Sequence, residues 1–168
     1  GDILDIKAYL FSLPADPAPN RPHRVSFFFG SRFMVNAWNV LNLKPGPMQP
    51  VPTRSAAWNR GAYLVEALGH CGECHTPRDS VGGFKRQLHL SGTKDGPGGE
   101  TMPNITPDKK TGIGKWPDSD LKDLFSLGML PDGDFVGGGM AEFVTHTSSK
   151  WTKEDTASII VYLRSLAP

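Results

Sequence analysis

The residues best suited to chemistry in this chain form one short cluster, Cys71-Gly72-Glu73-Cys74-His75. The spacing C-x-x-C-H places two thiols about one helical turn apart, so that each can add to one vinyl group of the same haem. The residue that follows then places an imidazole under the iron. The pattern predicts one covalent haem c, attached through Cys71 and Cys74 and ligated by His75.

Three other uses of such a cluster are less consistent with the rest of the chain. A thioredoxin-like redox pair belongs in a βαβ setting, which the sequence does not indicate. A zinc site needs a second pair of ligands at matching spacing, and the chain has only these two cysteines. A structural disulfide across a two-residue gap would be an unusual choice in a chain of 168 residues. We therefore favour haem attachment.

The motif does not identify a sixth ligand for the iron. A methionine thioether is a good candidate, because it stabilises ferrous haem and raises the potential. Met102 and Met140 both stand in segments that we expect to be loops, and Met140 follows three glycines, which let a backbone approach a flat cofactor closely. The other possible ligands are less well placed: Met34, Met48, Met129, His23, His70, His89 and His146.

Composition limits the class of protein. Hydrophobic residues make up 38% and charged residues 21%, which is typical of a globular chain. The net charge of +1 excludes a strong basic footprint for nucleic acid. The 19 glycines and 15 prolines indicate long loops around an organising centre. No stretch is apolar enough for a clean membrane span, since Arg32 and three asparagines interrupt the best candidate, residues 25–43.

Apolar spacing predicts four helices and no strands. The expected helices are 2–13, 59–68, 118–127 and 152–166, of which the second and third are closed by Gly69 and Gly128. Thr152 followed by Asp155 resembles a capping box at the start of the last helix. Residues 82–114 and 131–139, dense in Gly and Pro, are expected to be loops.

The first and last predicted helices repeat each other. A shift of 153 residues aligns six identities in register, namely Asp2 with Asp155, Ile6 with Ile159, Tyr9 with Tyr162, Leu10 with Leu163, Ser12 with Ser165 and Leu13 with Leu166. So many identities over so short a span favour an internal repeat over coincidence. We therefore predict that residues 1–14 are the closing helix of a preceding, similar domain, that 15–54 form a Pro-rich and aromatic linker, and that 55–168 form the haem domain.

The haem segment resembles a known family. Tyr63-Leu64-Val65 and His70 to Arg78, together with Pro103-Asn104-Ile105-Thr106-Pro107-Asp108 and Thr111 to Trp116, are similar to segments of cytochrome c subunits of bacterial membrane-associated dehydrogenases that serve alcohol, gluconate and related oxidations. The resemblance runs from about Trp58 to Pro168, and such subunits typically carry several cytochrome domains in tandem. It implies an all-α class I cytochrome c fold with long Gly/Pro-rich loops around one haem.

The resemblance also implies roles for particular residues. It makes Met140 the sixth ligand, although Ala141 departs from the Met-Pro pair of many members. It places Asn104, Ile105, Thr106 and the Trp116 indole near the haem propionates, where buried carboxylates need donors; Trp116 could equally be a core aromatic residue. Gly61 would sit where the first helix of the domain crosses the last, near Tyr162.

These features predict an electron-transfer subunit rather than an enzyme. Its donor would be the catalytic subunit of a partner dehydrogenase, and its acceptor a downstream cytochrome, a quinone or an oxidase. The c-type motif and the resemblance imply a periplasmic location, with possible membrane association through the complex. Two alternatives remain open: a haem enzyme or gas sensor with a displaceable sixth ligand, and a docking module whose aromatic segment, 27–38, anchors a dehydrogenase.

Overall fold

The computed structural model describes residues 1–22 and 30–168. The chain divides into two compact units, Gly1–Leu43 and Lys44–Pro168. Their boundary falls inside the segment 15–54 that we predicted to be a linker. Part of the predicted aromatic segment, Phe27 to Phe29, lies outside the described residues.

In its described residues, the first unit contains two helices, and neither buries any of its residues. Helix α1 spans Asp2–Ser12, as predicted, and Pro14 follows its end. Helix α2 spans Arg32–Asn42 and was not predicted, because its aromatic and asparagine-rich sequence has low helix propensity. The amide of Asn42 donates to the Trp38 carbonyl at 3.0 Å in the last turn of α2.

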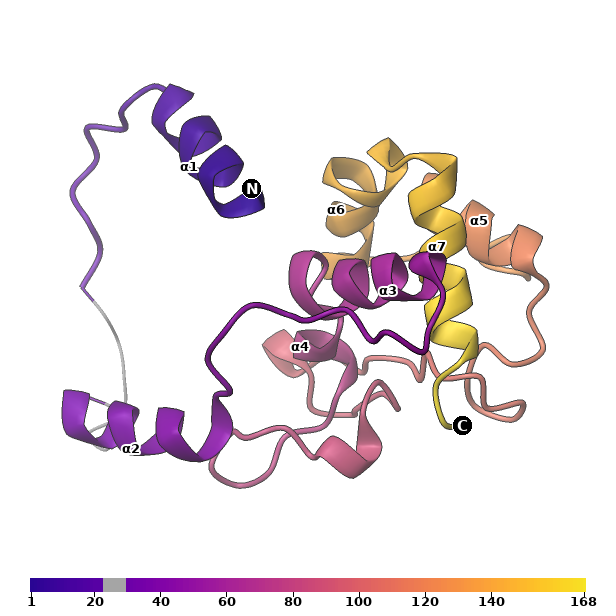
Figure 1. Ribbon diagram of the computed structural model, residues 1–168, viewed down its shortest axis with the longest axis horizontal. Helices are drawn as coiled ribbons and strands as arrows, with labels where there is room; N and C mark the ends of the chain where they lie inside the picture. The colour runs from indigo at the N-terminus through magenta and orange to yellow at the C-terminus, as the bar shows by residue number, and fades with distance from the viewer. Residues whose placement is uncertain (23–29) are drawn as a thin grey trace. The chain divides into compact units, whose positions relative to one another are not determined.

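The second unit is helical and has no strand among its residues, which agrees with the all-α prediction (Figure 1). Its helices are α3 (Ala56–Tyr63), which continues as a π-helical turn (Leu64–Leu68), then α4 (Gly72–His75), α5 (Asp118–Leu127), α6 (Gly138–His146) and α7 (Lys153–Arg164). Short 3₁₀ turns cover Arg86–Leu88, Pro97–Gly99 and Ser148–Lys150.

The predicted ends of α5 and α7 are close to those observed, whereas α3 begins at Ala56, three residues before the predicted start at residue 59. Ser55 and Thr152 cap α3 and α7 through their side-chain oxygens, and Thr152 accepts from the Asp155 backbone N–H at 3.1 Å. Gly128 ends α5 at φ +76°, a left-handed conformation that favours glycine. Helix α6 was missed, because glycines at its start are typical of loops.

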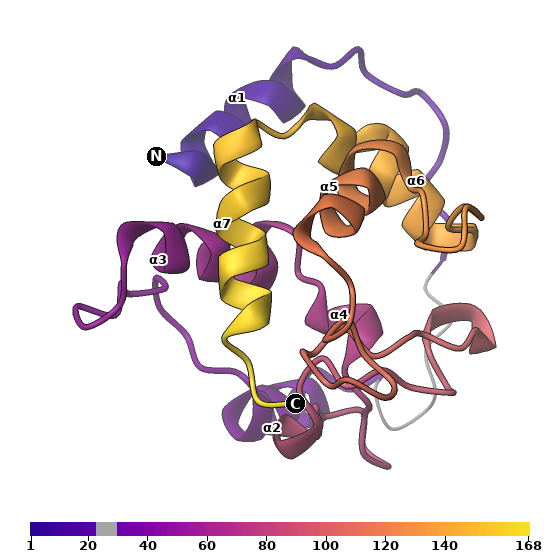
Figure 2. The ribbon, with the colours of Figure 1, turned by 90° about the vertical axis from the view of Figure 1, so that its right-hand side faces the viewer.

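The core forms where α3 crosses α7 (Figures 1 and 2). Gly61 makes the close approach possible, since a Cβ there would lie 2.0 Å from the Ser158 carbonyl oxygen and 2.9 Å from the Tyr162 Cβ. The predicted contact between Gly61 and Tyr162 is therefore confirmed. Leu90, Leu121 and Ile159 are among the fully buried side chains of the core around this crossing.

Long loops join α4 to α5, as the glycine and proline content predicted, and hydrogen bonds attach them to the helices. Arg164 of α7 donates to the carbonyls of Ile113 and Trp116 and to the carboxylate of Asp118. Isolated backbone bridges, such as the one between Thr93 and Met102, fold the loops on themselves. Of the helices in the described part of the chain, none has the length and apolar character to cross a membrane.

Candidate haem site

The C-x-x-C-H cluster occupies one helical turn, which Gly69 and His70 separate from the π-helical segment. The Cys71 amide donates to the Val65 carbonyl at 3.0 Å, and the His75 amide donates to the Cys71 carbonyl at 3.0 Å. Residues three and four apart on a helix face the same side. Helix α4 therefore presents Cys71, Cys74 and His75 together, as the spacing predicted.

The two thiols are free, and both cysteines are half-buried. Burial raises the pKa of the Cys71 thiol to about 12, and the nearby Glu66 carboxylate adds to the rise. Redox-active cysteines have lowered pKa values in electropositive surroundings. The surroundings of Cys71 therefore disfavour the thioredoxin-like alternative and suit a thiol that becomes a buried thioether.

The His75 imidazole is oriented by a backbone carbonyl. Its Nδ1 lies 2.8 Å from the Pro103 carbonyl oxygen, and its own carbonyl accepts from the Gly92 amide at 2.7 Å. Burial lowers the pKa of His75, partly offset by the bond to Pro103, so the ring is neutral near neutral pH. With Nδ1 donating to the carbonyl, Nε2 is the ring nitrogen left for a metal, which is the usual arrangement of a metal-binding histidine.

Met140 lies in the first turn of α6, not in a loop as the sequence suggested. It packs against the same hydrophobic cluster as Cys71, Ile105 and Trp116. A Cβ placed on Gly69 would lie 3.4 Å from the Cys71 sulfur and 3.7 Å from the Phe143 ring, so α6 also lies close to the first cysteine. The structure thus brings four of the eight predicted site residues to one cluster.

The rival methionine, Met102, is engaged within its own loop. Its backbone pairs with that of Thr93, with hydrogen bonds of 2.7 and 2.9 Å. Its Cγ and Cε atoms lie 2.6 and 3.1 Å from the position that a Cβ on Gly96 would take. Met102 therefore packs on the glycine of a tight loop, which favours Met140 as the thioether ligand.

Asn104 and Thr106 shape the loop that carries the Pro103 carbonyl. The Asn104 side chain accepts from the Thr106 amide at 2.8 Å and donates to the Thr111 hydroxyl at 2.9 Å. Thr106 is buried, and its carbonyl accepts from the Ile113 amide at 2.9 Å. Trp116 is half-buried against the core, as in the core-aromatic interpretation. The predicted role of these residues near propionates remains a prediction.

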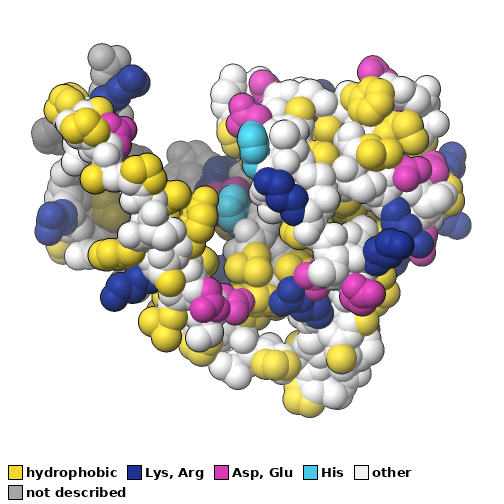
Figure 3. Space-filling model, turned by 90° about the horizontal axis from the view of Figure 1, so that it is seen from above, with side chains coloured by type: hydrophobic (Ala, Val, Ile, Leu, Met, Phe, Trp, Pro, Cys, Tyr) yellow, Lys and Arg dark blue, Asp and Glu magenta, His cyan; other side chains and the backbone are white. Residues whose placement is uncertain are grey.

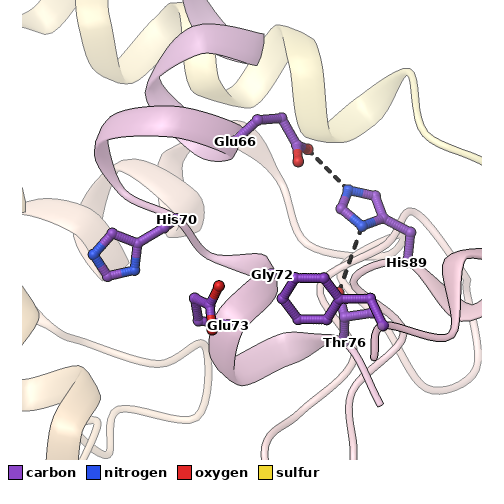
Figure 4. Close-up of a pocket in the computed structure, with 7 residues that line it drawn as sticks. Glu66, His70, Gly72, Glu73, Thr76 and His89 are labelled. Atoms are coloured by element: carbon purple, nitrogen blue, oxygen red, sulfur yellow. Dashed lines mark hydrogen bonds and ion pairs between the residues drawn. The ribbon is translucent and has the colours of Figure 1, made fainter. Parts of the chain in front are cut away.

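A network of polar side chains behind α4 was missed by sequence reasoning (Figure 4). Glu66 accepts from the Tyr162 hydroxyl at 2.7 Å and lies 2.8 Å from Nε2 of His89, whose Nδ1 lies 3.5 Å from the Thr76 hydroxyl. Burial raises the pKa of Glu66, but the hydrogen bonds from His89 and Tyr162 outweigh it, so the pKa lies below its ordinary value. The only signal in the sequence was a carboxylate among apolar neighbours, in the stretch Leu64–Leu68.

The residues at this site fit a haem c. The donors are two thiols, one neutral imidazole with a single nitrogen left for iron, and a half-buried thioether. A Cβ on Gly137 or Gly139, beside Met140, would meet no protein atom within 4 Å. Across residues 1–22 and 30–168, no group of three or more His, Cys, Asp or Glu side chains could hold a metal ion instead.

Comparison with known proteins supports the same class. The chain is 40% identical over 164 residues, 97% of its length, to the diheme cytochrome c-type protein of Cereibacter sphaeroides. It is 33% identical over 168 residues to the fructose dehydrogenase cytochrome subunit of Gluconobacter japonicus. It is also 36% identical over 125 residues, 70% of its length, to the gluconate 2-dehydrogenase cytochrome c subunit of Pantoea cypripedii. No family model matches the chain.

The predicted resemblance is therefore confirmed: the chain is homologous, over most of its length, to cytochrome c subunits of dehydrogenases. These relatives imply electron transfer and a haem c. The chain spans about half the length of the first relative (53%) and about a third of the second (34%).

Proposed function

We propose that this chain holds one covalent haem c and relays electrons from the catalytic subunit of a partner dehydrogenase to a respiratory acceptor in the periplasm. The acceptor would be a further cytochrome, a quinone or an oxidase. The contact that carries the proposal is the 2.8 Å approach of His75 Nδ1 to the Pro103 carbonyl, because it prepares the ring to bind a metal through Nε2.

Four residues of the chain would hold the cofactor. Cys71 and Cys74 would form the thioethers, and His75 and Met140 would fill the two axial positions in a class I cytochrome c arrangement. The haem would supply a one-electron couple between ferric and ferrous iron. The protein sets the potential of such a couple through axial ligands, hydrogen bonds and burial. With His75 and Met140 both bound to the iron, no iron site would be left for a substrate, which favours electron relay over substrate chemistry.

The chain offers supporting structure around those ligands. The buried cluster that includes Leu64, Val65 and Leu90 lies against Cys71 and Met140 and would exclude water from that side of the site. The Glu66–His89–Tyr162 network joins the helix that leads into Cys71 to the final helix α7. Such fixed surroundings suit electron transfer, because little has to rearrange when the charge of the iron changes.

The partner and the compartment are inferred from chemistry and relationship. Relatives named as cytochrome subunits of fructose and gluconate dehydrogenases support a dehydrogenase as electron donor. The covalent attachment motif supports a location outside the cytoplasm. The identity of the substrate would then be determined by the catalytic subunit, not by this chain.

Carbon monoxide binding tests the proposal against the alternative of a haem enzyme or gas sensor. The holoprotein should be reduced and reoxidised reversibly, and its ferrous form should not change its absorption spectrum under carbon monoxide. Ready carbon monoxide binding by the unmodified protein would contradict the relay and support a displaceable sixth ligand.

A further inference from the structure

A half-buried histidine, His89, lies against the helical turn 71–75 and has no part in the proposed attachment of the haem. Its ring packs on Gly72, since a Cβ placed there would lie 3.6 Å from the His89 Cε1 atom. Its Nδ1 lies 3.5 Å from the hydroxyl of Thr76, the residue that follows His75. His89 therefore contacts the turn at two points, neither of which is a proposed iron ligand.

The backbone holds His89 in this position. The next residue, Leu90, is fully buried and left-handed at φ +59°, a conformation that is uncommon for residues other than glycine. Its amide donates to the Thr76 hydroxyl oxygen at 3.0 Å, and its carbonyl accepts from the Ile105 amide at 3.0 Å. Backbone strain of this kind persists only where the surrounding structure fixes it, and it gathers at functional sites.

The bonding partners of His89 suit both of its protonation states. Glu66 is a carboxylate, which only accepts, so the Nε2 atom that lies 2.8 Å from it carries a hydrogen. The Thr76 oxygen accepts from the Leu90 amide, and its own hydrogen can be donated to Nδ1 of a neutral ring. Its second lone pair can instead accept from Nδ1 of a protonated ring. His89 can therefore gain a proton without losing a hydrogen bond.

Water can reach the pair formed by Glu66 and His89. Their side chains are 30% and 34% exposed and line a cavity of about 100 Å³, with His89 between Glu66 and Thr76 (Figure 4). A polar cavity of that volume admits water molecules. The other titratable or charged groups around the pair are Tyr162 of α7, Cys71 and Glu73 of the turn, His70 before it, and Arg78, Lys85 and Arg86 in the segment between the turn and His89.

Most of these groups keep one charge state near neutral pH. Glu73 pairs with Arg78 at the surface, and burial together with a bonded carboxylate raises the pKa of Tyr162. Histidine is the residue type whose charge changes between about pH 5 and 8. On the face that Figure 3 shows, basic and acidic side chains are mixed, and exposed charges are screened by salt. His89, with His70 as its rival, is therefore the group whose charge can respond to the iron.

We propose that His89 takes up a proton when the haem is reduced, so that the chain carries a proton together with its electron. The step balances: the partner dehydrogenase supplies the electron to the iron, and water in the cavity supplies the proton that bonds to Nδ1. Both leave when the iron is oxidised again. The electron favours the uptake, because it lowers the positive charge that opposes a second positive charge nearby. The proposal rests on the proposed function only for a haem that can be reduced.

The reduction potential of the holoprotein, measured as a function of pH, tests this proposal. In the unmodified protein the equilibrium constant for reduction should fall roughly threefold to tenfold between about pH 5 and 8. His89→Gln keeps a donor for Glu66 but cannot gain a proton, and it should lose most of this dependence. His70→Gln is the matched control and should retain the dependence, because His70 lines the same cavity and makes no bond to the other residues drawn in Figure 4.

A second measurement does not depend on how well the variants fold. Reduction of the unmodified protein in weakly buffered solution should take up part of a proton per electron, and the ring signals of His89 in NMR spectra should show a larger protonated fraction in the ferrous protein at the same pH. A potential that does not vary with pH, or reduction without proton uptake, would overturn the proposal.

The variants distinguish other sites of protonation. A pH dependence that persists in His89→Gln would place the proton on another group, such as a haem carboxylate, and one that His70→Gln abolishes would place it on His70; either result would overturn the proposal. Each of these outcomes leaves a haem that is reduced and reoxidised, so the proposed function stands. A protein that holds no haem would instead contradict the proposed function.

Discussion

The two sides of the candidate haem site are built differently. On the His75 side, backbone groups of two other segments, the Pro103 carbonyl and the Gly92 amide, bond the histidine, and His89 braces the turn through Thr76. On the other side, α6 begins at Gly138, two residues before Met140, and no side chain caps it. From this comparison we expect the fold to hold the His75 side more firmly than the Met140 side.

Removing the fixed ligand should have the largest effect. His75→Ala deprives the iron of the imidazole that the loop at Pro103 orients, and the yield of low-spin holoprotein should fall roughly tenfold or more. Absorbance spectra of equal amounts of protein measure this. His70→Ala is the matched control, because His70 is exposed and adjoins the same cysteine. Equal losses of holoprotein in the two variants would contradict the assignment of His75 as the iron ligand.

Replacing the adjustable ligand should change the chemistry without losing the cofactor. Met140→Ala should open one axial position, allow carbon monoxide to bind and abolish the near-infrared band of methionine–iron ligation. The potential should fall by a sizeable part of the roughly 0.8 V that axial ligands span. Met102→Ala is the control. If the band survives in Met140→Ala and disappears in Met102→Ala, the assignment of the sixth ligand is wrong.

The network behind α4 should contribute to stability in a pH-dependent way. Glu66→Gln weakens the bonds to His89 and Tyr162, which should cost about 1–2 kcal/mol of unfolding free energy near neutral pH. The folded-state pKa of Glu66 is lowered, so its contribution is present above the unfolded value of about 4.3 and is lost as the pH falls through the folded value. Denaturant unfolding at several pH values should show the difference shrinking in acid.

Glu73→Gln supplies the control for that measurement. Glu73 is an exposed carboxylate on α4, and it pairs with Arg78 at the surface. Exposed pairs of this kind contribute about 0–1 kcal/mol. A larger cost for Glu73→Gln than for Glu66→Gln would mean that the network around Glu66 does not brace the site.

The smallest effect is expected from the loop that supports His75 indirectly. Asn104→Ala removes two hydrogen bonds within the loop, to Thr106 and Thr111, and should cost about 1 kcal/mol. The potential should shift slightly while the haem stays bound. Lys109→Ala, an exposed change on the same loop, should leave stability and potential unaltered. A loss of haem in Asn104→Ala would give this residue a direct role in binding.

The sequence predicted those parts of the site that depend on residues close together in the chain. The spacing of Cys71, Cys74 and His75 predicted one turn with three functional groups, and the apolar period predicted α3, α5 and α7. The Pro103 carbonyl could not be found this way, because any residue has a carbonyl and only the fold brings this one to His75. Helix α6 was missed because its glycines resemble a loop, while packing of Val144 against the core stabilises the helix.

The intact mass of the holoprotein under denaturing conditions tests the central claim most directly. The account predicts the mass of the polypeptide plus one haem, and a Cys71→Ser, Cys74→Ser variant that carries none. Haem that separates from the polypeptide in acidified organic solvent would contradict covalent attachment. A mass without haem from cells that mature c-type cytochromes would contradict the account altogether.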